Sequence, residues 1–171
     1  FDFSFDVSLL SKGVMMKKLC GWTGFLLRLE LPSGDNQVTS SMDYAGDFIG
    51  GRLYASRIYW DEVPQATGAL SPENLLMIMP GPLTGTAAIG CSRWVVSAKS
   101  PHSYPDQYGF GNGGGFFGAA LKRAGYDGMI ISGKAKKLSY ILIESGKASV
   151  KDAEGLKGLE THETRDRLRE Q

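Results

Sequence analysis

The sequence predicts an α+β fold with mixed β-sheets and few helices. Gly24–Leu31 alternates between polar and apolar residues and runs into a Pro-Ser-Gly-Asp-Asn turn, so it indicates a strand whose hairpin partner is Val38–Ser41. Leu75–Met79 is a continuous apolar run, which suits a buried strand. The expected strands neither alternate strictly with helices nor follow one another unbroken, and this order favours a mixed sheet.

Two helical segments are expected between the hairpin and the buried strand. Asp43 can cap a short helix, Tyr44–Ile49, which Gly50-Gly51 interrupts. The second helix, Arg52–Glu62, has apolar residues at helical spacing and ends before Pro64.

The second half of the chain is predicted to contain strands, a loop and two helices. Arg93–Ala98 has the apolar centre of an inner strand, and the polar segment Lys99–Gln107, which contains two prolines, is expected to be a loop. Gly114–Ala124 places small and apolar residues on one face, as a packed helix does. The remaining expected elements are the strands Gly128–Gly133, Leu138–Glu144 and Ala148–Asp152 and a charged helix, Thr161–Gln171.

The composition limits the size of the protein and its partners. A chain of 171 residues fits one domain with its own core and excludes a second large domain. Lys plus Arg number 19 against 18 Asp plus Glu, so no strong field attracts nucleic acid or an anionic membrane. The apolar runs fall far short of the ~20 residues of a membrane span. Cys20 and Cys91 lie in no CxxC pair, which favours a reducing, cytoplasmic setting.

The two ends of the chain are expected to differ from the domain between them. Phe1–Val14 has neither the basic nor the apolar region of a secretory signal. Because the chain begins with Phe and Met15-Met16 follows, residues 1–18 are expected to be a leader or an upstream extension outside the fold. Residues 19–171 are expected to form one domain that is incomplete at its C-terminus, because Leu168 on the last helix has only the preceding chain to pack on.

The stretch Gly81–Gly125 has the features that suggest a ligand. Two glycine-bearing turns, Gly81–Thr86 and Gly111–Gly115, flank an apolar run, and the second turn leads into the predicted helix. Glycine lets backbone N–H groups approach a ligand, and the start of a helix attracts anions. Arg93 between the turns adds a guanidinium suited to phosphate, so the stretch predicts a site for a phosphate-bearing cofactor.

Simpler explanations stay open for these features. Glycine-rich turns are usually only turns, and Arg93 at a strand end can be a solvated side chain. Gly109–Gly114 lacks the preceding strand and the following acidic residue of a dinucleotide fingerprint, and no Lys-Ser or Lys-Thr makes it a P-loop. Residue chemistry alone therefore reaches an anion-binding α+β domain and no further.

Residues that bind metals or act in catalysis are sparse. A lone cysteine such as Cys91 is more often a small buried residue than a nucleophile. His102 and His162 have no partner at the spacing of a zinc site. Glu73 and the pair Asp61-Glu62 are better explained as solvated acids. The sequence therefore predicts no catalytic residue.

Several motifs stand in a fixed order from about Leu19 to the end of the chain. They are Gly21–Arg28, Phe48–Arg52, Leu70–Asn74, Gly81–Thr86, Arg93, Lys99–Pro101, Asn112–Gly118 and Leu121–Asp127. In order and spacing they resemble the N-terminal domain of the tungsten-containing aldehyde:ferredoxin oxidoreductase family. The resemblance implies a base of two intertwined, related β-rich halves for a bis-pterin cofactor, with the second half truncated here.

The resemblance also implies cofactors and the residues that bind them. The cofactor is a tungsten, or molybdenum, bis-pterin whose dithiolenes hold the metal. Arg93 and Asn112 with Gly114 would contact the pterin and its phosphates, and the carbonyl of Asn112 would help to bind the magnesium that bridges the phosphates. An iron-sulfur (4Fe-4S) cluster is implied for the full-length protein, with cysteine ligands in a CxxCxxxC motif that this chain lacks.

The activity that the resemblance implies is the oxidation of an aldehyde to a carboxylic acid, with ferredoxin as the electron acceptor, in a cytoplasmic homodimer. The fragment alone is expected to be inactive. The family usually has Gly-Gly-Arg-Gly where this chain has Gly50–Leu53, and often Gly-Gly-Arg where Cys91–Arg93 stands. These departures leave open a branch that reduces an aromatic thioester or acts on an unknown substrate. A stand-alone binding domain without activity is the alternative from a different class.

Overall fold

A computed structural model describes residues 20–31 and 33–170, so the expectation for residues 1–18 lies outside the described part of the chain. The strands are β1 (Phe25–Glu30), β2 (Asn36–Ser40), β3 (Leu76–Pro80), β4 (Trp94–Ser100), β5 (Gln107–Gly113), β6 (Gly128–Ser132), β7 (Ser139–Glu144) and β8 (Lys147–Asp152). The helices are α1 (Met42–Ala45), α2 (Gly51–Glu62), α3 (Phe117–Arg123) and α4 (Thr161–Arg169), with a 3-10 turn at Glu154–Leu156.

The strands form a mixed sheet and a separate hairpin. The sheet has six strands in the order β2-β1-β6-β3-β4-β5, and β7 pairs only with β8. Strands β1 and β6 run parallel, and the other neighbours are antiparallel. The predicted α+β fold with a mixed sheet and few helices is therefore confirmed. The pairing of this half with a second, related half stays a prediction.

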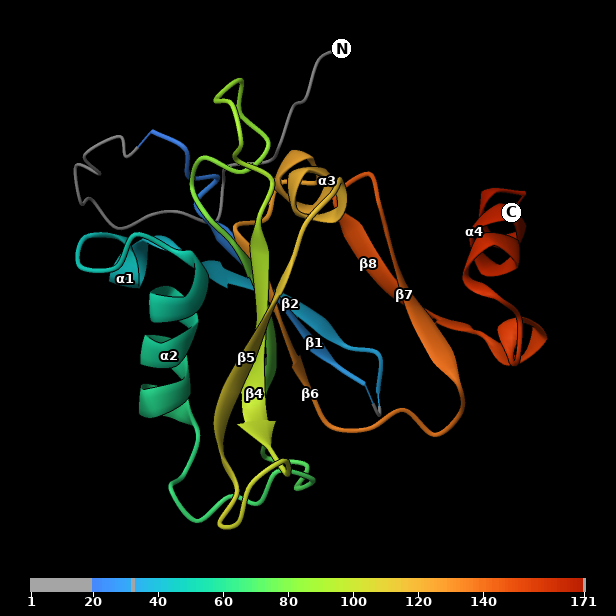
Figure 1. Ribbon diagram of the computed structural model, residues 1–171, viewed down its shortest axis with the longest axis horizontal. Helices are drawn as coiled ribbons and strands as arrows, with labels where there is room; N and C mark the ends of the chain where they lie inside the picture. Colours follow the sequence, from blue (N-terminus) through green and yellow to red (C-terminus); the bar gives the residue numbers. More distant parts are fainter. Residues whose placement is uncertain (1–19, 32, 171) are drawn as a thin grey trace.

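The two faces of the sheet are covered by different elements (Figure 1). Helix α2 lies over one face, where Tyr54, Ala55 and Ile58 pack against buried side chains of β1, β3 and β6. Helix α3 and the hairpin β7-β8 lie on the other face, where Leu121 and Ala148 contact the opposite side chains of β1 and β6. Burial on both faces explains why Leu26 and Leu27, adjacent on β1, are both buried.

The Leu-Ser-Pro-Glu-Asn motif has a structural role. The amide nitrogen of Asn74 donates to the carbonyls of Ala69 (2.7 Å) and Lys99 (3.0 Å), and its oxygen accepts from the N–H of Lys99 (3.2 Å). Asn74 therefore ties the loop before β3 to the end of β4, because one side chain satisfies three backbone groups.

The structure corrects three details of the sequence prediction. Gln107–Gly113 is a strand, so Gly111–Gly115 is a turn only in its second half. The first helix is Met42–Ala45 and begins before the predicted Tyr44. Helix α3 begins at Phe117, three residues after the predicted Gly114. Strand β5 escaped prediction because glycine has low strand propensity, and its pairing with β4 decides the conformation.

No helix in the described part of the chain has the length and apolar character needed to cross a membrane.

The contact between Gly128 and Met79 gives a test of the packing. A Cβ on Gly128 would lie 2.2 Å from the Met79 sulfur, and the Met79 side chain is buried. Gly128→Ala is therefore expected to lower the free energy of unfolding by about 1–3 kcal/mol through overpacking. Gly155→Ala is the matched control, because nothing lies within 4 Å of its Cβ position. Urea unfolding followed by tryptophan fluorescence measures both variants. Equal stability of the two would contradict the packing argument.

Candidate functional site

Strand pairing brings Arg93 and Gly114 together. The ladder between β4 and β5 ends where Trp94 pairs with Gly113. Arg93 immediately precedes Trp94 and Gly114 immediately follows Gly113, so the two lie side by side at the end of the antiparallel pair. Both residues are exposed. The structure thus brings the backbone of the predicted arginine next to the predicted glycine turn.

Packing explains several glycines of the stretch without any ligand. A Cβ on Gly113 would lie 2.3 Å from the Trp94 ring, and the Trp94 indole N–H donates to the carbonyl of Gly114 (3.1 Å). A Cβ on Gly118 would lie 3.0 Å from Thr84, and one on Gly85 would lie 3.2 Å from the Cα of Ala119. For these positions the simpler explanation holds, because α3 and the tryptophan ring lie directly on the backbone.

Gly114 differs from these glycines. No atom of residues 20–31 or 33–170 lies within 4 Å of a Cβ placed on Gly114, and its backbone is not in the left-handed region. Gly115 is also open, although its φ of 78° favours glycine by itself. Within the described part of the chain, the N–H groups of Gly114 and Gly115 donate no hydrogen bond. This turn therefore has both space for a ligand and backbone N–H groups that could donate to it.

The 81–86 turn is tied directly to Arg93. The Thr84 hydroxyl donates to the carbonyl of Arg93 (2.9 Å) and accepts from the N–H of Gly81 (3.2 Å). Thr84 is buried, whereas the Arg93 side chain is exposed. The turn thus fixes the Arg93 backbone and leaves its guanidinium accessible to an anion.

Asn112 lies two residues before Gly114, on an edge strand. It pairs with Val95, and β5 is the last strand of the six-stranded sheet. Alternate residues of an edge strand direct their main-chain groups away from the sheet, where a cation or a ligand can reach them. On the same strand the Phe110 ring lies under the Arg52 guanidinium, 4.4 Å from its central carbon.

A buried ion pair joins α3 to the residue before β6. The Lys122 ammonium contacts the Asp127 carboxylate, and the two side chains are only 9% and 2% exposed. The carboxylate also accepts from the N–H of Thr23 (2.9 Å), the N–H of Gly24 (2.8 Å) and the hydroxyl of Ser41 (2.5 Å). Asp127 therefore has four donors from three separate segments.

These contacts determine how Asp127 titrates. Burial by itself raises the pKa of a carboxyl group, but the hydrogen bonds from Lys122, Ser41 and Thr23 and the charge of Lys122 outweigh it, so the pKa of Asp127 is lowered. Burial, together with the charge of Asp127, raises the pKa of Tyr54, whose hydroxyl donates to the carbonyl of Ser41 (2.5 Å). Asp127 is thus ionised and Tyr54 neutral around pH 7.

The sequence matches the family described as "Aldehyde ferredoxin oxidoreductase, N-terminal domain" over residues 26–171. The chain belongs to this family. It is 38% identical over 152 residues to the tungsten-containing aldehyde ferredoxin oxidoreductase of Pyrococcus furiosus, an alignment that covers 86% of this chain and 24% of the relative. The family resemblance seen in the motifs is thereby confirmed.

Other relatives of this aldehyde ferredoxin oxidoreductase domain have different names. The aliphatic sulfonate oxidoreductase, WOR-like subunit, of Pyrococcus furiosus is 36% identical over 156 residues and matches 84% of this chain and 23% of its own length. The solved active site complex BamBC of benzoyl coenzyme A reductase with 1,5 dienoyl-CoA has a TM-score of 0.81 and 36% identity, over 88% of this chain and 23% of that chain. The chain spans about a quarter of the length of these relatives.

Sequence reasoning missed Lys122 and Asp127 as partners within the family domain. Both lie in the motif Leu121–Asp127, but their backbone partners at residues 21–24 are about a hundred positions away. One feature of the sequence could have indicated a buried charge. Lys122 follows Leu121 on a helix whose packed face consists of small and apolar residues.

The other residues weighed in the sequence do not gather at the site. Cys91 is half-buried, with its sulfur 3.7 Å from the carbonyl of Ile89, and Glu73 and His102 are exposed. Among residues 20–31 and 33–170, no three His, Cys, Asp or Glu side chains cluster in a way that could hold a metal ion.

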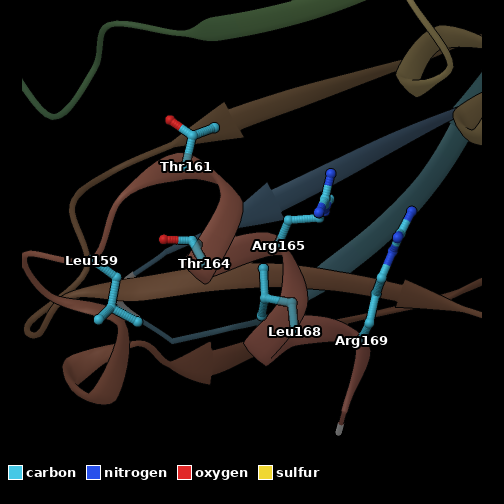
Figure 2. A pocket seen from close by; sticks show the side chains of 6 residues that line it. All are labelled: Leu159, Thr161, Thr164, Arg165, Leu168 and Arg169. Atoms are coloured by element: carbon cyan, nitrogen blue, oxygen red, sulfur yellow. The ribbon is translucent and has the colours of Figure 1, made fainter.

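A hollow of about 610 Å³ lies away from the predicted site residues, beside α4. Figure 2 shows the side chains that line it, with Arg165, Leu168 and Arg169 along one side of the helix and Leu159 at its start. The capping box between Glu160 and Glu163 stabilises the first turn of α4, and no residue of the helix is buried. The hollow is lined by residues between 159 and 169 and includes none of Arg93, Asn112 and Gly114.

The Asp127 contacts predict how stability depends on pH. Asp127→Asn is expected to lower the free energy of unfolding by about 3–5 kcal/mol at pH 7, because Lys122 would stay buried without a charged partner. Since the folded-state pKa is lowered, the contribution of Asp127 is present above its ordinary pKa of 3.8 and is lost as the pH falls through the folded-state value. The difference between wild type and variant should therefore be constant from pH 7 to about pH 5 and shrink below about pH 4.

Urea unfolding at pH 7, 5 and 3 measures this difference. Asp47→Asn is the control, because Asp47 is exposed, and it should change stability by less than about 0.5 kcal/mol. A difference that grows toward low pH would contradict the assignment.

Proposed function

We propose that this chain is the pterin-binding domain of a tungsten, or molybdenum, iron-sulfur oxidoreductase, and that Arg93, Asn112 and Gly114 bind the cofactor. One observation supports the site above the others. Within the described part of the chain, neither packing nor backbone conformation requires a glycine at position 114 or at the nearby Gly111, and Gly114 lies beside an exposed arginine. Space for a ligand accounts for a glycine at that position.

The donors at the site fit a phosphate-bearing group. Phosphate oxygens accept from a guanidinium and from backbone N–H groups, which Arg93, Gly114 and Gly115 supply at one turn. Magnesium prefers oxygen ligands, and a main-chain carbonyl on an edge strand such as that of Asn112 is a suitable one. By family resemblance, the pterin dithiolenes hold the tungsten, so the protein needs no metal ligand of its own.

The activity of the full-length protein is part of the same proposal. The cofactor supplies two-electron redox chemistry, and the net reaction converts an aldehyde and water to a carboxylic acid, two protons and two electrons. The electrons pass through an iron-sulfur cluster, bound elsewhere in the polypeptide, to ferredoxin. The residues of this domain hold and orient the cofactor and fix the donors around its phosphates. Its setting is the cytoplasm, and its assembly is a homodimer.

A second substrate class is supported by a specific observation. Relatives at similar identity are named for an aliphatic sulfonate and for benzoyl coenzyme A. Leu53 and Cys91 also depart from the usual family pattern, at the start of α2 and in the loop before Arg93. Reduction of an aromatic thioester is therefore the alternative activity, and a binding domain without activity is the alternative from another class.

Metal and pterin analysis of the full-length protein tests the function. After expression with tungstate, the protein is expected to contain tungsten or molybdenum, pterin and iron. Folded full-length protein with none of these would contradict the proposal. Reduction of ferredoxin by aldehydes, compared with turnover of an aromatic thioester, separates the two substrate classes.

A substitution at Arg93 tests the site. Arg93→Met in the full-length protein should weaken cofactor retention about ten- to hundredfold, because it removes one or two charge-assisted hydrogen bonds. Arg57→Met is the matched control, since Arg57 is an exposed arginine whose ion pair is with Asp61 on α2. Tungsten per protein after repeated gel filtration measures retention. Equal retention in the two variants would exclude Arg93 from the site.

A further inference from the structure

The Lys122–Asp127 pair holds a segment on which the 81–86 turn rests. The Lys122 ammonium donates to the carbonyl of Gly21 (2.7 Å), and Asp127 accepts from the N–H groups of Thr23 and Gly24. The pair thus fixes both the carbonyl and the N–H groups of residues 21–24. A buried ion pair adds little net stability compared with apolar side chains of the same volume. The backbone groups that this pair holds in place are therefore a better reason for its presence than its contribution to the stability of the fold.

Residues 21–24 in turn touch the backbone of the glycine turn. A Cβ on Gly21 would lie 2.6 Å from the carbonyl oxygen of Pro82, and Gly21 has a φ of 87°. A Cβ on Gly50 would lie 3.1 Å from the Pro82 ring. Pro82 therefore lies close to the backbone at both Gly21 and Gly50, and a shift of Gly21 moves the turn.

The contacts close into a ring through α3. Thr84 of the turn touches Gly118 and Gly85 touches Ala119, both on the helix that carries Lys122 one turn later. Thr84 also binds the carbonyl of Arg93. The ring runs from α3 through Lys122, Gly21 and Pro82 to Thr84 and back to α3, so the position of each member depends on the others.

We propose that Lys122 and Asp127 are positioning residues for the cofactor site. They fix Gly21–Gly24 beneath Pro82 and thereby set the separation between the 81–86 turn, Arg93 and the open Gly114–Gly115 turn. Both side chains are buried, so they would act on the cofactor through the backbone that they hold and not by direct contact. This inference rests on the proposed function for the identity of the ligand. The positions of the 81–86 turn, Arg93 and the Gly114–Gly115 turn can be measured without any ligand.

Hydrogen exchange in the full-length protein without cofactor tests the positioning. The N–H groups of Thr84 and Thr86 donate to the carbonyls of Gly81 (3.0 Å) and Leu83 (3.2 Å) and report the shape of the turn. In Lys122→Met, exchange at these two positions should rise at least about tenfold, to a greater extent than in β1 or β6. Lys122→Arg, which keeps the charge and the donors, should restore part of the protection.

Arg28→Met is the control for stability alone. Arg28 makes a bidentate pair with Glu62 (2.7 and 2.5 Å) between β1 and α2, away from the turn. The Arg28→Met variant should lower the free energy of unfolding without a selective rise in the hydrogen-exchange rates of Thr84 and Thr86. Equal effects of Lys122→Met and Arg28→Met on Thr84 and Thr86 would overturn the proposal. If Lys122→Met does not fold, Asp127→Asn decides, because it removes the charged acceptor of Lys122, Thr23 and Gly24, and unchanged exchange at Thr84 and Thr86 in that variant would also overturn the proposal.

Measuring tungsten retention allows the positioning proposal and the proposed function to be tested separately. With cofactor, Lys122→Met should lose tungsten about as fast as Arg93→Met, and Arg28→Met should keep it. Full-length wild type without any tungsten or pterin would refute the proposed function, and the exchange result would still decide the positioning.

Discussion

The buried contact between Lys122 and Asp127 is the constraint on which the site side of the molecule depends. Its carboxylate fixes the start of β1 through Thr23 and Gly24 and the end of the first hairpin through Ser41. Since β6 begins at the next residue and runs parallel to β1, the same carboxylate also sets the alignment of the two central strands. One group therefore positions the sheet and the backbone beneath the 81–86 turn.

Glycines in this domain serve two purposes that the sequence cannot separate. Gly113, Gly118 and Gly128 make room for a tryptophan ring, a threonine methyl group and a methionine side chain. Among the residues that the structure describes, none lies within 4 Å of a Cβ placed on Gly114. Only the positions of neighbouring side chains reveal this difference, and it removes Gly85, Gly113 and Gly118 from the ligand argument. Under the proposed function, the phosphate-bearing cofactor would bind at the Gly114–Gly115 turn.

Apolar patterns in the sequence predicted most of the fold, because buried strands such as β3 and amphipathic helices such as α2 encode their environment locally. Strand β5 could not be predicted, because glycines give no strand signal and its pairing with β4 is a tertiary effect. The predicted neighbours Arg93 and Gly114 lie together, but their ligand stays a prediction. Lys122 and Asp127 were hidden because their backbone partners near Gly21 are distant in the sequence.

The position of β5 at the edge of the sheet affects the energetics of the whole domain. Among the described strands this one has a single neighbour, β4, and several of its residues are glycines. Side-chain contacts with α2, such as those of Tyr108 with Tyr59 and Ser56, also hold it in place. A ligand that binds along it only in the folded state raises the stability of the domain by an amount that grows with ligand concentration. The cofactor would then stabilise the fold in addition to supplying the redox chemistry. The lifetime of the domain in the cell would therefore depend on the supply of cofactor.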